Sequence, residues 1–98
     1  MDIKLITSNK KQFLDLLLLA DEQESMIDKY MERGEMFALY DNDLKAVSVV
    51  TCEGGSIYKI KNIAVYPSSQ RKGYGKRLID YLFEYYQGKC SVMYVGTE

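Results

Sequence analysis

The hydrophobic residues of this chain follow two spacings, one typical of β-strands and one typical of helices. Short runs rich in β-branched and aromatic residues, bounded by glycine, asparagine or aspartate, predict strands, and the longest run covers residues 57–65. Hydrophobic residues three or four positions apart predict amphipathic helices. In chain order, the pattern predicts a strand at 3–6, helices at 10–20 and 22–33, strands at 36–40, 44–51 and 57–65, a helix at 74–87 and a strand at 90–95.

The boundaries of the predicted helices carry their own signals. Asn9 with Gln12 three residues later is typical of a capping box, and Gly34 and Gly88 stand where the second and third helices end. The buried positions expected in the first two helices and the strand that follows are Leu16, Leu17, Leu18, Leu19, Met26, Ile27, Tyr30, Met31, Met36 and Phe37. The third helix is expected to bury one stripe, formed by Leu78, Ile79, Leu82, Phe83 and Tyr86.

A glycine-spaced turn follows the longest predicted strand. Pro67 ends this strand because proline lacks a backbone donor. Gly73 and Gly75 let the chain curl so that successive N–H groups point at one anion, and the helix that begins here adds its partial positive charge. The turn is surrounded by four cations, Arg71, Lys72, Lys76 and Arg77. These features together predict a phosphate-binding unit, although two glycines also serve ordinary strand-to-helix turns.

Two other phosphate-binding loops do not match this turn. A P-loop requires lysine and then serine or threonine after its second glycine, whereas Lys76 and Arg77 follow Gly75. A Rossmann turn requires a third glycine or an alanine, and Leu78 stands in that position. The sequence therefore favours a third kind of loop.

The turn and the strand before it resemble the acetyl-CoA signature of the GCN5-related N-acetyltransferases, the GNAT family. Asn62-Ile63-Ala64-Val65-Tyr66-Pro67 is similar to the strand end of that family, and Gln70-Arg71-Lys72-Gly73-Tyr74-Gly75 is similar to its Q/R-x-x-G-x-G/A loop. The resemblance implies an α/β (α+β) acyltransferase fold with a mixed, mostly antiparallel sheet, in one domain over residues 1–98 that stops after the fifth strand. It also implies acetyl-CoA as cosubstrate and no metal.

In this family the pyrophosphate of acetyl-CoA lies over the loop, and the pantetheine arm lies along the preceding strand. The backbone N–H of Ile63 matches the position that faces the thioester carbonyl, where a fixed donor stabilises the charge that develops as an amine attacks. The implied reaction is direct transfer of acetyl to a primary amine of a small molecule or a protein. The implied cofactor-binding residues are Ile63, Ala64, Val65, Gln70, Arg71, Lys72, Gly73, Tyr74, Gly75 and Lys76.

The catalytic groups depart from the family pattern. Many members place a glutamate base four residues before the carbonyl-facing position, and this sequence has Lys59 there. A lysine serves as a base only when strongly desolvated, and its charge would repel a cationic acceptor. Glu35, Asp43 and Glu53 could reach the site, but exposed turn carboxylates are the simpler interpretation. The general base therefore stays unassigned.

The chain also lacks the C-terminal segment that carries the family's tyrosine acid. It stops at Glu98, which predicts either a fragment of a longer protein, the favoured interpretation, or a shortened module. Tyr85 and Tyr94 are expected to pack rather than to protonate the thiolate, so the acid is unassigned as well. An uncovered edge at the last strand predicts self-association as a homodimer.

Composition and charge narrow the class of protein further. The chain has 98 residues, 47% of them hydrophobic and 28% charged, which fits one globular core. A net charge of −1 argues against nucleic-acid binding, and a phosphate contact at residues 71–77 stays a weaker alternative. The apolar run at 16–19 follows Asp15 and is much shorter than the roughly 20 residues of a membrane span. We expect a cytoplasmic protein.

Cysteine and histidine usage restricts the chemistry. The chain has no histidine and only Cys52 and Cys90, which leaves no zinc site and no Cys/His nucleophile pair. Two reduced, buried thiols are favoured over a disulfide because nothing indicates secretion.

Two classes of function remain open at this point. The first is an N-acetyltransferase, and the second is a catalytically incomplete CoA-binding module that acts through association. The acceptor is not specified by the sequence. Asp21, Glu22 and Glu24 could attract a cationic acceptor, although acidic residues are also favourable at a helix start.

Overall fold

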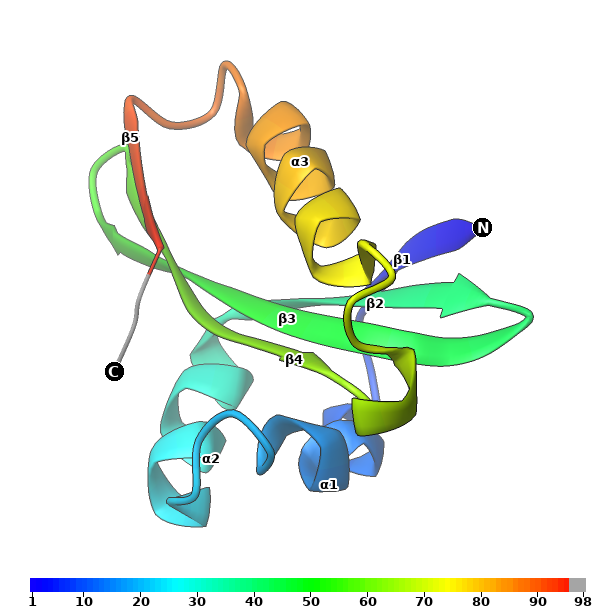
Figure 1. Cartoon of the computed structure of the whole chain (residues 1–98). Coiled ribbons are helices and arrows are strands. Elements are labelled where there is room, and N and C mark those ends of the chain that lie inside the picture. Colours follow the sequence, from blue (N-terminus) through cyan, green and yellow to red (C-terminus); the bar gives the residue numbers. More distant parts are fainter. Residues whose placement is uncertain (96–98) are drawn as a thin grey trace.

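The computed structural model describes residues 1–95, and it shows a five-stranded sheet with helices on both faces (Figure 1). The expected βααβββαβ order is confirmed, with two short 3-10 turns added at Lys10–Phe13 and Pro67–Ser69. The expected chain end at 96–98 lies outside the described residues. The strands are β1 (Asp2–Ile6), β2 (Glu35–Asp41), β3 (Asp43–Gly54), β4 (Ile57–Val65) and β5 (Val92–Val95). The helices are α1 (Leu14–Leu17), α2 (Glu24–Arg33) and α3 (Tyr74–Tyr86).

The sheet is mixed and mostly antiparallel, as expected. The strands lie in the order β1-β2-β3-β4-β5, the first four pair antiparallel, and β5 runs parallel to β4. Asn42 in the β2–β3 turn has a φ of 72°, and Gly54 and Gly55 in the β3–β4 turn have φ values of 122° and 57°. Asparagine and glycine tolerate these conformations best, which explains why both predicted turns form.

A hydrophobic core lies on each face of the sheet. Helices α1 and α2 cover one face and α3 covers the other (Figure 1). Side chains alternate along a strand, so Phe37 packs with the α3 core while its neighbour Ala38 packs with the α1–α2 core. Within residues 1–95, no helix has the length and apolar character needed to cross a membrane.

The helix expected at 10–20 forms as two shorter pieces, and its predicted capping box is wrong. Asn9 has φ 54° and ψ 43°, and its side chain makes no capping hydrogen bond. The main chain closes this turn instead, with the Gln12 N–H donating to the Asn9 carbonyl at 3.2 Å. After α1 the chain tightens, because Leu19 bonds to the carbonyl three residues before it. The chain then turns away, which leaves Leu19 55% exposed although it was expected in the core.

Other positions expected to be buried lie at the surface. Met26 is 44% exposed on α2, and Phe83 lies on the outer side of α3. The sheet covers only the narrow stripe of each helix that faces it, so residues at the margin of the apolar pattern stay in water. Cys52 is exposed and Cys90 is half-buried, so the expectation of buried thiols is wrong, but both are free thiols as predicted.

Two features mark the end of helix α2: close packing around Gly34 and a cation, Lys10, from another element. Gly34 has a φ of −96°, and a Cβ there would lie 2.7 Å from the carbonyl oxygens of Tyr30 and Val50. The Lys10 ammonium donates to the carbonyl oxygens of Met31 at 3.1 Å and Gly34 at 2.7 Å. A cation is favourable at the carbonyl end of a helix. Lys10 therefore joins the first 3-10 turn to the end of α2.

Candidate functional site

Strand β4 contains a bulge that changes the direction of its side chains. Val49 of β3 pairs with Asn62, whereas the next residue, Val50, pairs with Ile60, so Lys61 is the extra residue. Ile60 packs in the α3 core, and Asn62 contacts the α1–α2 side. In a regular strand, residues two apart would share a face. The bulge therefore reverses the facing of the second half of β4.

The described pairing between β4 and β5 extends as far as this bulge. The last pair between the two strands is Ile60 with Val95, and no β5 residue in the described part of the chain pairs with residues 61–65. Main-chain groups of this stretch that point away from β3 are the ones that could pair with a ligand. Three predicted site residues lie in this second half of β4, the buried Ala64 and the half-buried Ile63 and Val65.

The loop after β4 is fixed by hydrogen bonds within the chain. The side-chain amide of Gln70 donates to the Val65 carbonyl at 3.2 Å, and the Ser69 N–H donates to the Tyr66 carbonyl at 2.8 Å. Arg71 has a φ of 64°, so the chain is already in the left-handed region before the glycines. Gln70 thus braces the loop against the strand end, while its predicted contact with a cofactor stays a prediction.

Helix α3 presents free amide groups at its start. Gly73 precedes the helix with a φ of 86°, a conformation that favours glycine. The Arg77 N–H bonds to the Gly73 carbonyl at 3.0 Å and opens the helical series. The amides before it, those of Tyr74, Gly75 and Lys76, are the ones that a helix leaves without an intrahelical partner. This end of α3 can therefore bind an anion.

The strand edge and the helix start are neighbours in space. A Cβ on Gly75 would lie 3.7 Å from Val65 Cγ2, an ordinary contact distance. Arg71, Lys72 and Lys76 are exposed around the same point, and Lys76 pairs with Asp80 at 2.9 Å. An exposed pair of this kind contributes little to stability. The geometry thus brings the predicted loop residues to the C-terminal end of β4.

Tyr74 differs from its neighbours because its side chain turns into the fold. Its hydroxyl donates a 2.7 Å hydrogen bond to Asp41, 33 residues earlier in the β2–β3 turn. The hydrogen bond to this carboxylate raises the pKa of Tyr74. Asp43 in the same turn pairs with Lys45 at 2.7 Å, which lowers the pKa of Asp43. The turn therefore anchors the first residue of α3.

A chain of polar contacts lies on the opposite side of β4. The Asn62 side chain donates to the Tyr30 hydroxyl at 2.7 Å and to the Leu17 carbonyl at 3.3 Å. The Tyr30 hydroxyl donates to Asp21 at 3.4 Å, and the other oxygen of Asp21 accepts from the Gln23 N–H at 3.1 Å. Burial raises the pKa of Tyr30. This series of hydrogen bonds was not predicted from the sequence. Its one signal in the sequence is Asn62, an asparagine inside an apolar strand.

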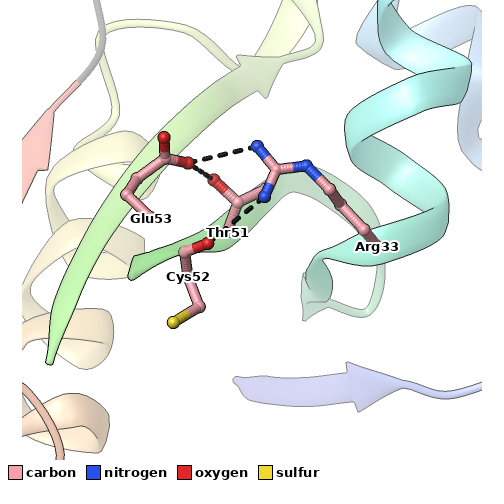
Figure 2. Close-up of polar contacts among 4 residues, drawn as sticks. All are labelled: Arg33, Thr51, Cys52 and Glu53. Carbon is pink, nitrogen blue, oxygen red and sulfur yellow. Dashed lines mark hydrogen bonds and ion pairs between the residues drawn. The ribbon is translucent and has the colours of Figure 1, made fainter. Parts of the chain in front are cut away.

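The carboxylates considered as general bases already have partners. Glu53 accepts hydrogen bonds from Thr51 and from Arg33, the latter at 3.2 Å, and Arg33 also donates to the Cys52 carbonyl (Figure 2). The Thr51 hydrogen bond is the main reason why the pKa of Glu53 is lowered. Glu35 accepts a hydrogen bond from the Tyr86 hydroxyl.

Lys59 occupies the expected base position, and Tyr85 and Tyr94 are the tyrosines considered for the acid. Lys59 is half-buried and pairs with Thr51 across the sheet. Tyr85 packs edge-on against Phe37, with ring centres 5.1 Å apart, and Tyr94 is exposed on β5. No group of three or more potential metal ligands occurs in residues 1–95. The described geometry therefore assigns neither a general base nor a general acid.

Comparison with known proteins agrees with this geometry. Residues 32–98 match the family model of the acetyltransferase (GNAT) domain. The chain is also 40% identical over 78 residues to YvbK of Bacillus subtilis (strain 168), which is described as an uncharacterized N-acetyltransferase. The match covers 79% of this chain and 50% of YvbK, so the chain spans about half the length of this curated relative.

Two solved structures show the same fold. A GNAT family acetyltransferase from Elizabethkingia anophelis with acetyl-CoA bound superposes with a TM-score of 0.82 and 31% identity, over 90% of this chain and 58% of that one. A Bacillus subtilis acetyltransferase in complex with CoA gives a TM-score of 0.79 and 36% identity, over 88% of this chain and 57% of that one. The predicted fold is thus confirmed, and this chain belongs to the GCN5-related N-acetyltransferase (GNAT) family.

Proposed function

We propose that this chain is the cofactor-binding part of an acetyl-CoA-dependent N-acetyltransferase. One observation carries the proposal: the C-terminal end of β4, at Val65, lies beside the N-terminus of α3, at Gly75. Acetyl-CoA has a pyrophosphate and a long arm with amide groups that ends in a thioester. An open strand edge can pair with the amides of such an arm, and a helix N-terminus can bind its pyrophosphate.

Each part of the cofactor has a counterpart in this arrangement. The amides of Tyr74, Gly75 and Lys76 would donate to the pyrophosphate, and the exposed cations Arg71 and Lys72 would balance its charge. The pantetheine arm would pair with the main chain at Val65 and Ala64. The N–H of Ile63 would then face the thioester oxygen.

The proposed reaction is a direct transfer. The lone pair of a neutral amine attacks the carbonyl carbon, a C–N bond forms, and the C–S bond breaks. CoA leaves as a thiolate that takes up a proton, while the amine nitrogen releases one. Negative charge develops on the carbonyl oxygen during the attack, and a fixed N–H at Ile63 would stabilise it. An ammonium ion must lose a proton before it can attack, so a base is needed.

The relatives support the identity of the cofactor. The Elizabethkingia structure holds acetyl-CoA and the Bacillus subtilis structure holds CoA, and both are more than 30% identical to this chain. The similarity covers 90% and 88% of this chain, so it includes most of the described sheet and helices.

A second candidate function is a CoA-binding module that acts through association. The observations that favour it are Lys59 at the expected base position and the engagement of Glu35 and Glu53 with other side chains. Under this proposal the cofactor binds as above but no acetyl group is transferred.

We also propose that β5 mediates self-association. Within residues 1–95, β5 pairs with β4 alone, and it exposes the apolar side chains Val92, Tyr94 and Val95. Exposed strand edges pair readily with other chains. Sedimentation velocity across a range of concentrations would test this, since a concentration-independent monomer contradicts it.

Calorimetric titration with acetyl-CoA tests the cofactor proposal. Binding with one site per chain is expected, and no binding would exclude both candidate functions. CoA release in the presence of a panel of primary amines then separates the two. Release that depends on an amine supports the transferase, and binding without release supports the module.

A further inference from the structure

A cavity of about 410 Å³ opens beside the bulge of β4. Such a volume falls within the range of small-molecule sites, about 300–1,000 Å³. The proposed cofactor site uses none of the residues that line this cavity. They come from the α1–α2 loop, from α2 and from β4, and they are Asp21, Gln23, Met26, Tyr30 and Lys61.

The cavity lies beside the residues that precede Ile63, the proposed contact of the thioester. Lys61 is the bulge residue, two positions before Ile63. Asp21 is joined to Asn62, the residue before Ile63, by two hydrogen bonds through Tyr30, of 3.4 and 2.7 Å. A molecule in this cavity would therefore lie within reach of an acetyl group held at Ile63, an inference that rests on the function proposed above.

The cavity wall carries two opposite charges. The Asp21 carboxylate is held in place by the Gln23 N–H and the Tyr30 hydroxyl. Lys61 is half-buried, and its ammonium forms no ion pair with any residue between 1 and 95. A ligand with one cationic and one anionic group would complement these two side chains.

The wall also offers an apolar contact. Met26 belongs to the first turn of α2, where the hydrophobic pattern predicts a core residue, yet it is 44% exposed and lines this cavity. Methionine side chains adapt to apolar ligands of different shapes. Contact with an apolar group would remove this side chain from water.

We propose that this cavity is the acceptor site and that it takes a free α-amino acid with an apolar side chain. The ammonium group binds at Asp21, the carboxylate at Lys61 and the side chain against Met26. A diamine would bring a second ammonium to Lys61 and be repelled. The amino terminus of a peptide would place a neutral amide where Lys61 favours a carboxylate.

Three compounds of similar shape test the assignment. L-leucine carries both charges, L-leucinamide carries only the ammonium, and 4-methylpentanoate carries only the carboxylate. Each is titrated calorimetrically into the 98-residue chain, with and without saturating CoA. L-leucine is expected to bind at least about tenfold more tightly than either of the other two, because each lacks one of the two ion pairs.

Two substitutions and a matched control assign the charges to residues. Lys61→Met should remove the preference for leucine over leucinamide, and Asp21→Asn should remove the preference for leucine over 4-methylpentanoate. Lys59→Met removes the same charge from the same strand but lies outside the cavity lining, so it should preserve both preferences. Thermal unfolding and acetyl-CoA affinity show whether each variant keeps its fold.

Equal wild-type affinity for leucine and either analogue, or equal effects of Lys61→Met and Lys59→Met, would overturn the proposal. Its failure is distinguishable from failure of the proposed function. Acetyl-CoA binding without leucine discrimination contradicts the acceptor site alone. Leucine discrimination without acetyl-CoA binding contradicts the proposed function and the acceptor role, and shows an amino-acid site only.

Discussion

The side-chain amide of Asn62 donates a 2.7 Å hydrogen bond to the hydroxyl of Tyr30, and this contact joins the bulged strand β4 to helix α2. Both residues are buried, with 4% of each surface exposed. Buried polar groups lose their interactions with water and depend on such partners. Tyr30 also lines the cavity of Asp21 and Lys61.

Removal of the Tyr30 hydroxyl should destabilise the fold. Tyr30→Phe leaves Asn62 with one partner fewer and is expected to lower the free energy of unfolding by about 1–3 kcal/mol. Urea denaturation followed by circular dichroism measures the change. Tyr85→Phe is the control, because the Tyr85 hydroxyl has no hydrogen bond to another residue in the described part of the chain. Equal losses in the two variants would contradict the assignment.

Lys10 should stabilise the fold far more than its neighbour Lys11. Lys10→Met removes the cation from the carbonyl end of α2 and should lower the free energy of unfolding by about 1–2 kcal/mol. Lys11→Met breaks only the exposed pair with Asp28 and should cost less than about 0.5 kcal/mol. Denaturation of both variants at one pH gives the comparison, and a larger loss for Lys11→Met would refute it.

The contacts of Glu53 should make the free energy of unfolding depend on pH in the acidic range. The pKa of Glu53 is lowered in the folded chain, chiefly by the Thr51 hydrogen bond and then by Arg33. As pH falls, the unfolded chain therefore takes up this proton first, and protonation favours unfolding. The stabilisation is present above the ordinary pKa of about 4.5 and is lost below it.

Glu53→Gln tests this expectation because the variant lacks the titrating group. The difference in unfolding free energy between wild type and Glu53→Gln should shrink as pH is lowered from about 7 to about 3. Urea denaturation at several pH values would reveal it. A difference that stays constant over this range would show that Glu53 does not carry the effect.

Gly75 should tolerate alanine although it belongs to the cofactor loop. A Cβ there meets only Val65 Cγ2, at 3.7 Å, and alanine favours the helical conformation of this turn. Gly75→Ala is therefore expected to keep the free energy of unfolding or raise it by about 0.5 kcal/mol. Its affinity for acetyl-CoA should stay within about threefold of wild type. Loss of stability would mean that the first turn of α3 is packed more tightly than the structure shows.

Local sequence signals predicted the order of elements and the loop, because these depend on neighbouring residues. The turns at Asn42 and Gly55 and the strand end at Pro67 are examples, since each residue restricts its own backbone. The prediction of one helix at 10–20 was wrong because it also relied on neighbouring residues alone. Its end depends on which leucines the sheet covers, and that is a property of the whole fold.

Contacts between distant segments could not be predicted in this way. Tyr74 meets Asp41 and Lys10 meets the end of α2 only after the sheet has formed. The bulge at Lys61 is similar, because two strands must pair before one of them can hold an extra residue. Met26 was expected in the core from its spacing, and its exposure beside the cavity becomes visible only when the helix is placed on the sheet.

If acetyl-CoA binds where β4 meets α3, substitutions at the two ends of α3 should affect its binding differently. Gly73 and Gly88 stand before and after α3 with the same φ of 86°, and no atom lies within 4 Å of a Cβ at either site. Valine at either position imposes the same backbone strain, of about 1–3 kcal/mol. The two variants therefore differ in the place of the substituted residue: Gly73 lies in the cofactor loop, and Gly88 lies at the other end of α3.

Acetyl-CoA is titrated into wild type, Gly73→Val and Gly88→Val. Gly73→Val is expected to lose at least about thirtyfold in affinity, because a side chain and a distorted turn block the amides at the start of α3. Gly88→Val should bind as wild type does. Wild-type affinity in Gly73→Val, or an equal loss in both variants, would contradict the proposed cofactor site.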